Sequence, residues 1–297
     1  MKEDGIAERH YSQMEVKREI LRYTRGRWVA VHCSEKSEDG KPYLIRYTMR
    51  GERPLKISRL TEIDGILKRF RRLKPRTFYA TSNVYRKLAI KEDVMDLNNV
   101  MACTPVWDID NELEGWESTI EVAKEIVRFL ELNGIEESVY VKWSGRGCHV
   151  HLHEEAVSRR LREKIHPIDI AYAVVEYVNV KLARKYFEIA EKSSYSLRVE
   201  NNIDPQRLYT CPLSLHKTLD RVCVCMRKED LDSFDPSWTD VNKYRHFQEW
   251  NLYVPGEADG LALKAFQAVG PCPSRLRFRR RKHPPLDKQI LRWLKKT

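Results

Sequence analysis

The stretch Val106-Trp107-Asp108-Ile109-Asp110 predicts a β-strand. Side chains alternate along a strand, so Asp108 and Asp110 project from one face and Ile109 from the other. Mg²⁺ prefers oxygen ligands and keeps coordination sites open for substrate phosphates, so the pair predicts a metal site for phosphoryl or nucleotidyl transfer. Asp-x-Asp also occurs on solvent-facing strands and in metal-dependent glycosyltransferases, so other segments are needed to choose among these alternatives.

Helical and strand patterns alternate from this strand to about residue 200. A capping box from Ser118 to Glu121 predicts the start of an amphipathic helix that stops at Gly134, and its apolar face comprises Ile120, Ala123, Ile126, Val127 and Leu130. Strands are expected at 139–143 and 149–153, a long helix around 171–182, and a further strand near Tyr195. The order β-α-β-β-α-β is that of ferredoxin-like and RNA-recognition-like folds, which support many unrelated functions.

The flanking regions complete an α+β prediction. Residues 1–100 mix helical stretches with strands at 27–31 and 43–47, which indicates an N-terminal α/β lobe. We therefore expect one catalytic domain over 1–270, with an N-terminal lobe to about 100 and a motif-bearing lobe from 101. The segment 271–297 is a basic tail that either contacts nucleic acid or a partner, or is a solvated terminus. Its cations include Arg275, Arg277, Arg279, Arg280, Arg281 and Lys282.

Charge and composition narrow the class of protein. The 297 residues carry a formal net charge of +11, which favours a polyanionic partner, although a solvated basic surface would also explain it. No apolar run approaches the roughly 20 residues that cross a bilayer, and the charged N-terminus lacks the apolar core of a secretory signal. We expect a cytoplasmic protein with no membrane partner, whose seven dispersed Cys are reduced thiols.

A glycine-containing turn follows between the two middle strands. It reads Ser144-Gly145-Arg146-Gly147-Cys148-His149. Glycines let the backbone approach a phosphate, Arg146 offers a fork of donors, and Ser144 and His149 add polar contacts, so we predict a triphosphate cradle. An ordinary hairpin would explain the glycines but not the three polar residues. His149, His151 and His153 share a face by alternation, which leaves a zinc site or a half-buried polar face as alternatives.

A third segment can complete the site. A two-metal site needs another carboxylate, and either Glu200 or Asp204 can supply it, although Asp204-Pro205 is also a common turn. The cationic and hydroxyl groups of the downstream segment, which runs from Arg207 to Thr218, are expected to face the triphosphate.

Together these elements resemble the motifs of the archaeo-eukaryotic primase superfamily, most closely the catalytic small subunit of archaeal and eukaryotic DNA primase. The resemblance runs from about residue 10 to 240. It includes Arg18-Glu19-Ile20, residues 78–85 and Phe234-Asp235-Pro236, in the family's order, and depends mainly on the Ser-Gly-Arg-Gly-x-His turn and on Ser-Leu-His-Lys-Thr at 214–218.

The resemblance implies a primase catalytic core with an RNA-recognition-like unit packed on the N-terminal lobe. It implies that Asp108 and Asp110 bind catalytic Mg²⁺ or Mn²⁺, that Ser144, Arg146 and His149 hold a nucleoside triphosphate, and that Ser214, His216 and Lys217 face it. For the third metal ligand it favours Glu200, after Val199, over Asp204, which matches a second acidic position. The implied partners are single-stranded DNA template and a primase large subunit.

Two departures from the family pattern stand out. Thr210 occupies a position that is usually basic. The region from 111 to 143 contains neither Cys nor His, so the family's structural zinc is not predicted. A different zinc site could use Cys211, Cys223, Cys225 and Cys272, although Cys223 and Cys225 are better explained by a buried strand.

The expected activity is synthesis of short RNA or DNA primers on single-stranded DNA by two-metal nucleotidyl transfer. Three alternatives remain: a repair or plasmid-type primase-polymerase of the same superfamily, a catalytically decayed nucleic-acid-binding subunit, and a metal-dependent phosphoesterase built on His149, His151 and His153.

Overall fold

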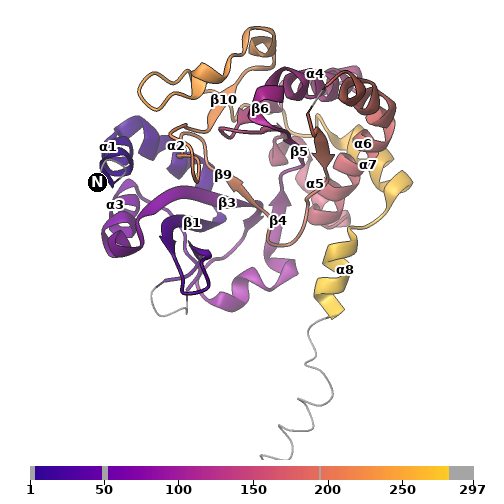
Figure 1. Ribbon diagram of the computed structural model, residues 1–297. Coiled ribbons are helices and arrows are strands. Elements are labelled where there is room, and N and C mark those ends of the chain that lie inside the picture. Colours follow the sequence, from indigo (N-terminus) through magenta and orange to yellow (C-terminus); the bar gives the residue numbers. More distant parts are fainter. Residues whose placement is uncertain (1–3, 49–52, 194, 281–297) are drawn as a thin grey trace, which may run out of the picture.

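The computed structural model describes residues 4–48, 53–193 and 195–280. In these ranges the chain forms two antiparallel five-stranded sheets that lie side by side, with helices at both ends of the pair (Figure 1). Arg281 and Lys282 of the basic tail lie outside the described residues.

The first sheet belongs mainly to the N-terminal lobe. Its strand order is β2 (Pro42–Ile45), β1 (Arg27–Lys36), β3 (Pro75–Tyr85), β4 (Val100–Cys103), and β9 (Leu208–Thr210) also pairs with β3. Three helices accompany it at one end of the molecule: α1 (Asp4–Ser12), α2 (Met14–Thr24) and α3 (Leu60–Arg69). The strand expected at 43–47 is confirmed to within two residues, and the strand expected at 27–31 extends five residues further, to Lys36.

The second sheet carries the predicted β-α-β-β-α-β unit. Its order is β10 (Val224–Met226), β6 (Val139–Trp143), β7 (Cys148–Leu152), β5 (Val106–Asp110), β8 (Arg198–Glu200). The four strands of the unit thus lie in the spatial order second, third, first, fourth, as in RNA-recognition-like folds. The unit's helices are α4 (Trp116–Leu132) and α6 (Pro167–Lys192), and the short α5 (Arg159–Lys164) precedes α6. The α+β prediction is confirmed.

Helix α4 forms because its apolar residues recur at helical spacing. All five predicted members of its apolar face are buried. The predicted start was wrong: Ser118 lies in the first turn, and its hydroxyl donates to the carbonyl of Gly115. The helix begins earlier because the 3₁₀ turn Leu113–Gly115 continues directly into it, while Gly134 ends it with a φ of 79°.

The C-terminal elements pack onto the second sheet's helices. They are α7 (Asp259–Val269), which packs on α6, and α8 (Pro273–Arg280). The first part of the basic segment is fixed there, because Arg275 forms an ion pair with the buried Asp169 of α6, and Asp169 also accepts from the Cys272 amide. In the described ranges, no helix is both long enough and apolar enough to span a bilayer.

Return of β9 to the first sheet joins the two lobes. Buried polar contacts reinforce this connection: Arg27 on β1 pairs with Glu154 after β7 at 2.6 Å, and Lys142 on β6 donates to the carbonyl of Thr210 on β9 at 2.7 Å. The two sheets are therefore joined by β9 and by buried side-chain contacts.

Candidate active site

A polar cleft of about 660 Å³ lies where the two sheets meet. It is lined by residues of β5, the β6–β7 turn, β8, β9 and the segment after β9. Nine of the eleven predicted site residues line it, and they are Asp108, Asp110, Ser144, Arg146, His149, Glu200, Arg207, His216 and Lys217.

Asp108 is at the centre of this arrangement. Strand β5 pairs with β7 and β8 so that Asp108 stands opposite His149 on one side and Glu200 on the other. The residue is 3% exposed, and His149 Nε2 lies 3.0 Å from Oδ1. The guanidinium of Arg207 donates to Oδ2. Burial alone would raise the pKa of Asp108, but His149 and then Arg207 hold it well below its usual range, so the side chain is a carboxylate at neutral pH.

Asn202 was not among the predicted site residues. Its amide Nδ2 donates to Asp108 Oδ2 and to Glu200 Oε2, both at 3.0 Å, so it bridges the two carboxylates. The sequence signal for it was only its position two residues after Glu200 in the loop that follows β8.

Asp110 shares the cleft with Asp108 and Glu200. Burial and the neighbouring charges of Asp108 and Glu200 raise its pKa. Three carboxylates on adjacent strands are a donor set suited to Mg²⁺ or Mn²⁺, and a cation would relieve their mutual repulsion. In the arrangement of the described residues, however, no three His, Cys, Asp or Glu side chains are grouped closely enough to hold a metal ion. Binding would require Asp108 to exchange a contact with Arg207 or Asn202.

Asp204, the second candidate for the third carboxylate, does not line the cleft. Its Oδ1 accepts from the Gln206 amide at 2.6 Å, which is a local turn contact. Of the two residues that the sequence left open, the structure brings only Glu200 to Asp108.

The glycines of the β6–β7 turn serve close packing between segments. A Cβ on Gly147 would lie 2.9 Å from the carbonyl oxygen of Ile109, and one on Gly145, whose φ is 107°, would lie 3.1 Å from His216. Ser144 Oγ donates to the carbonyl of Gly147 at 3.1 Å, while Arg146 is exposed. The turn thus fits against the carboxylate strand and presents the Arg146 guanidinium to the cleft.

The segment after β9 presents two further polar groups. His216 Nδ1 accepts from the amides of Thr218 and Leu219, so in the neutral ring the proton is on Nε2. Burial, with the neighbouring charges of Lys217 and Arg76, lowers the pKa of His216 to about 4. The neutral imidazole can therefore donate a hydrogen bond beside the Lys217 ammonium.

Ser214 requires a correction, because it is fully buried and does not line the cleft. Its hydroxyl accepts from the amide of Phe78 at 2.7 Å and lies 3.1 Å from the hydroxyl of Tyr11. Tyr11 on α1 in turn accepts from the Leu215 amide at 3.0 Å. Ser214 thus anchors the segment to the Phe78 amide and to Tyr11 in the protein interior and does not face the cleft.

The predicted histidine face is divided between different environments. His149 faces Asp108, whereas His151 is fully buried with its ring stacked on Tyr140, 4.7 Å between centroids. The ring of His153 stacks on Tyr253, and its Nδ1 accepts from the Glu155 amide. These rings do not form a three-histidine metal group in the described residues, which removes support for the phosphoesterase. The four cysteines considered for zinc are buried free thiols.

A neighbouring cavity extends the cleft over the first sheet. It shares Tyr79, Leu208, Lys217 and Thr218 with the cleft, and no Asp or Glu lines it. Its other lining residues are His32, Ser34, Lys36, Pro42, Leu44 and Arg76. The combination of cations with apolar and aromatic side chains suits nucleic acid.

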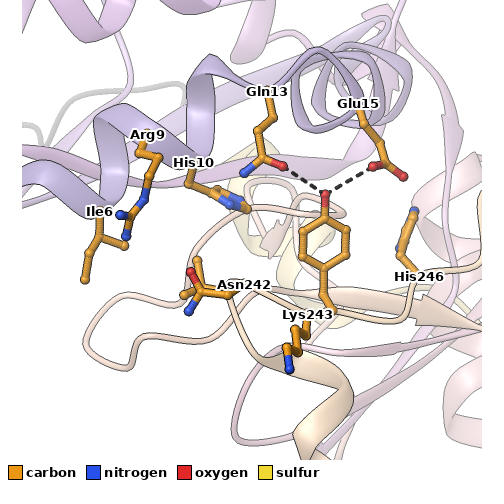
Figure 2. Close-up of a pocket in the computed structure, with 10 residues that line it drawn as sticks. Ile6, Arg9, His10, Gln13, Glu15, Asn242, Lys243 and His246 are labelled. Carbon is orange, nitrogen blue, oxygen red and sulfur yellow. Dashed lines mark hydrogen bonds between the residues drawn. The ribbon is translucent and has the colours of Figure 1, made fainter.

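Another cavity lies between α1 and residues 241–246 (Figure 2). Gln13 and Glu15 point toward the Tyr244 hydroxyl, which lies 3.3 Å from Gln13 Oε1 and 3.1 Å from Glu15 Oε2. His10, also in its lining, approaches the carbonyl of Leu213 through Nε2 at 2.7 Å. No predicted site residue lines this cavity, and its paired groups join the N-terminal helices to the later loops.

Comparison with solved structures identifies a similar fold. The polymerase domain from Mycobacterium tuberculosis ligase D, in complex with DNA, aligns with a TM-score of 0.54 and 15% sequence identity, over 92% of this chain and 91% of that one. No family model matches the sequence, and no curated protein matches it. The chain therefore has the α+β fold of a polymerase domain.

Proposed function

We propose that this chain is a template-directed nucleotidyltransferase of the archaeo-eukaryotic primase superfamily, which joins nucleotides on single-stranded DNA. The observation that carries the proposal is the convergence of Asp108, Asp110, Glu200 and His149 in one cleft with four cationic side chains, which are those of Arg146, Arg198, Arg207 and Lys217. The similarity to a polymerase domain adds a fold on which such a site can be built.

Arg146, His216 and Lys217 would bind the triphosphate. The two cations offset its negative charge, and the neutral His216 donates from Nε2 to a phosphate oxygen. Because His216 stays neutral at pH 7, its contact does not depend on protonation there.

Asp108, Asp110 and Glu200 would hold Mg²⁺ or Mn²⁺, which supplies charge neutralisation at the triphosphate and acidifies the attacking hydroxyl. His149 and Asn202 orient the Asp108 carboxylate. In the reaction, a 3′-hydroxyl would lose its proton to solvent water and its oxygen would bond to the α-phosphorus, while the bond from that phosphorus to the leaving pyrophosphate breaks. Arg207, which donates to the same carboxylate, would exchange this contact for the phosphates.

Single-stranded template would follow the basic cavity that opens from the cleft past Lys36 and Lys217. A finer assignment is initiation of primers, as by the catalytic small subunit of DNA primase. A repair or plasmid-type primase-polymerase would share these residues and would extend existing ends.

The test uses the full chain, an unprimed single-stranded DNA template, Mg²⁺ or Mn²⁺, and labelled ribonucleotides or deoxyribonucleotides. Short products that are lost in Asp108→Asn, while template affinity is retained, are expected. Products only with a pre-annealed primer would favour the extending enzyme. Template binding with no incorporation under either condition would overturn the proposal and leave a decayed nucleic-acid-binding subunit.

A further inference from the structure

A further cavity adjoins the basic cavity on the side away from the cleft. Its volume is about 850 Å³, and it shares Ser34 and Arg76 with the basic cavity, which in turn shares four lining residues with the cleft. It is lined by residues of α1, α3, the turn at 71–74 and the start of β3, and we call it the outer cavity. The three hollows therefore adjoin one another in series, from the Asp108 carboxylate to the end of the molecule that α1 and α3 occupy (Figure 1).

The outer cavity is strongly basic. Six Lys or Arg side chains line it, against two acidic side chains, Glu8 and Asp64. Both acids are engaged, because Asp64 pairs with Lys17 at 2.7 Å and Glu8 pairs with Arg71 at 3.7 Å. Such an excess of cations around one hollow favours a polyanionic partner.

Two of these cations have no partner of their own. In the described ranges, the exposed side chains of Lys68 on α3 and Arg72 in the 3₁₀ turn Arg71–Leu73 make neither an ion pair nor a hydrogen bond. Arg76 differs, since it pairs with Asp220 at 2.7 Å and donates to two backbone carbonyls of the segment after β9. Lys68 and Arg72 can therefore contact phosphate without giving up an existing pair.

The series of cavities follows β3. Tyr79 lines the cleft and the basic cavity, Arg76 lines the basic and outer cavities, and Pro75, at the start of the strand, lines the outer cavity. A strand rises about 3.3 Å per residue, so the way from Tyr79 back to Pro75 covers about 13 Å. Successive phosphates of a strand in B-form geometry lie about 3.4 Å apart along the axis, so about four of them fit this distance. A single small anion would occupy only one of the hollows.

Apolar side chains accompany the cations along the series. Leu44, which is 47% exposed, and the half-buried Tyr79 line the basic cavity, and Leu67 and Pro75 line the outer cavity. Proteins that bind single strands combine cations that follow the backbone with aromatic surface on which bases stack. The combination favours a nucleic-acid strand over an acidic peptide, which has no bases to stack.

We propose that the outer cavity is a second binding site for the single strand, in which Lys68 and Arg72 contact phosphates of nucleotides that lie beyond those held at the cleft. The inference rests on the proposed function only in taking this strand to be the template. Phosphate contacts position a strand and carry no sequence information. The outer cavity should therefore raise the affinity for long strands of any sequence.

Binding of oligodeoxythymidines without terminal phosphates tests the site, with lengths of about 4 and about 12 nucleotides. Lys68→Gln combined with Arg72→Gln should lower the affinity for the long strand about tenfold at about 0.1 M salt. The short strand can still bind beside the cleft, so its affinity should stay within about twofold. For the long strand, the slope of log affinity against log salt should become shallower by about 1.4, because each phosphate contact to a single strand contributes about 0.7.

Arg128→Gln combined with Lys185→Gln is the matched control. It removes the same charge from exposed side chains of α4 and α6 that are unpaired in the described ranges and line none of the three cavities. The control should keep the long-strand affinity within about twofold. An equal loss in the two variants would mean that only net charge matters, and this would overturn the proposal, as would an equal loss for long and short strands. Polyglutamate that binds as tightly as the long strand, with the same loss in the cavity variant, would overturn the assignment to nucleic acid.

The polymerase assay separates this inference from the proposed function. Lys68→Gln combined with Arg72→Gln should raise the KM for a long template about tenfold without a comparable change in kcat. If the parent protein binds long strands through the outer cavity but incorporates no nucleotide, the proposed function fails and the strand site stands. If the parent incorporates nucleotides and the cavity variant binds and copies long templates as the control does, the strand site fails and the proposed function stands.

Discussion

The choice between Glu200 and Asp204 can be tested by a pair of substitutions that each remove one negative charge. Glu200→Gln and Asp204→Asn keep side-chain size and one acceptor oxygen. Glu200 lines the cleft and contacts Asn202, whereas Asp204 accepts the Gln206 amide outside it. Loss of activity in one variant but not the other identifies the carboxylate that serves the reaction.

The two variants should differ in their effects on activity and on the free energy of unfolding. Glu200 is exposed and its described contact is one hydrogen bond, so Glu200→Gln should change the free energy of unfolding by less than about 0.5 kcal/mol. Loss of a ligand carboxylate should lower nucleotide incorporation at least about 100-fold, equivalent to roughly 2.7 kcal/mol of transition-state stabilisation. Asp204→Asn should retain both activity and stability, because Asn also accepts in such turns.

A third variant, Asp204→Ala, removes the acceptor and should cost about 1–2 kcal/mol of stability without loss of activity. Incorporation is measured at saturating template, and thermal unfolding is followed for each variant. If Asp204→Asn abolishes incorporation while Glu200→Gln retains it, the inference from cleft geometry is refuted.

Three other predictions follow from contacts away from the carboxylates. Burial alone would raise the pKa of Glu154, but Arg27 lowers it to about 2, so the stabilisation from this ion pair is complete above about pH 5 and is lost as pH falls toward 2. Glu154→Gln should lower the free energy of unfolding by roughly 3 kcal/mol at pH 7. In urea titrations at each pH, the variant should also show a smaller decrease of this free energy between pH 5 and pH 2. Gly147→Ala should displace β5 and lower nucleotide incorporation at least about tenfold. The control Gly65→Ala lies on α3 with nothing within 4 Å of the added Cβ, so it should stabilise the protein by about 0.5–1 kcal/mol. Equal activity in the two variants would contradict the packing argument. Tyr11→Phe leaves the Leu215 amide unpaired, so we expect the free energy of unfolding to fall by about 1–3 kcal/mol. Displacement of His216 and Lys217 should also raise the KM for nucleotide. An unchanged KM would mean that Tyr11 contributes to stability alone.

The parts of the fold that local periodicity determines were predicted correctly. Alternation placed Asp108 and Asp110 on one strand, and helical spacing identified the buried face of α4. The start of α4 was missed because Ser118 fits a capping box by composition, while the actual start follows from the preceding 3₁₀ turn, which residue types do not specify.

Non-local pairing was beyond the reach of such patterns. Strand β9 has three residues and pairs with β3, about 130 positions earlier in the chain. That pairing decides which side of the following segment faces the cleft, so Ser214 turned inward to Phe78 and Tyr11 while His216 and Lys217 turned outward. Asn202 was missed because a bridging amide between two carboxylates has no sequence pattern of its own.

The same pairing explains why the cleft should respond to changes in either lobe. Asp108 lies on β5 of the second sheet, yet Arg207, which binds its carboxylate, directly precedes the strand that joins the first sheet. Buried contacts of Arg27 with Glu154 and of Lys142 with Thr210 hold the sheets together beside this point. Removing one partner of a buried ion pair costs the protein several kcal/mol of stability. We therefore expect loss of the Glu154 charge to shift β9 and so to alter the cleft. If Glu154→Gln is less active at temperatures where it is still folded, the loss of activity comes from a changed alignment of the two sheets and not from unfolding.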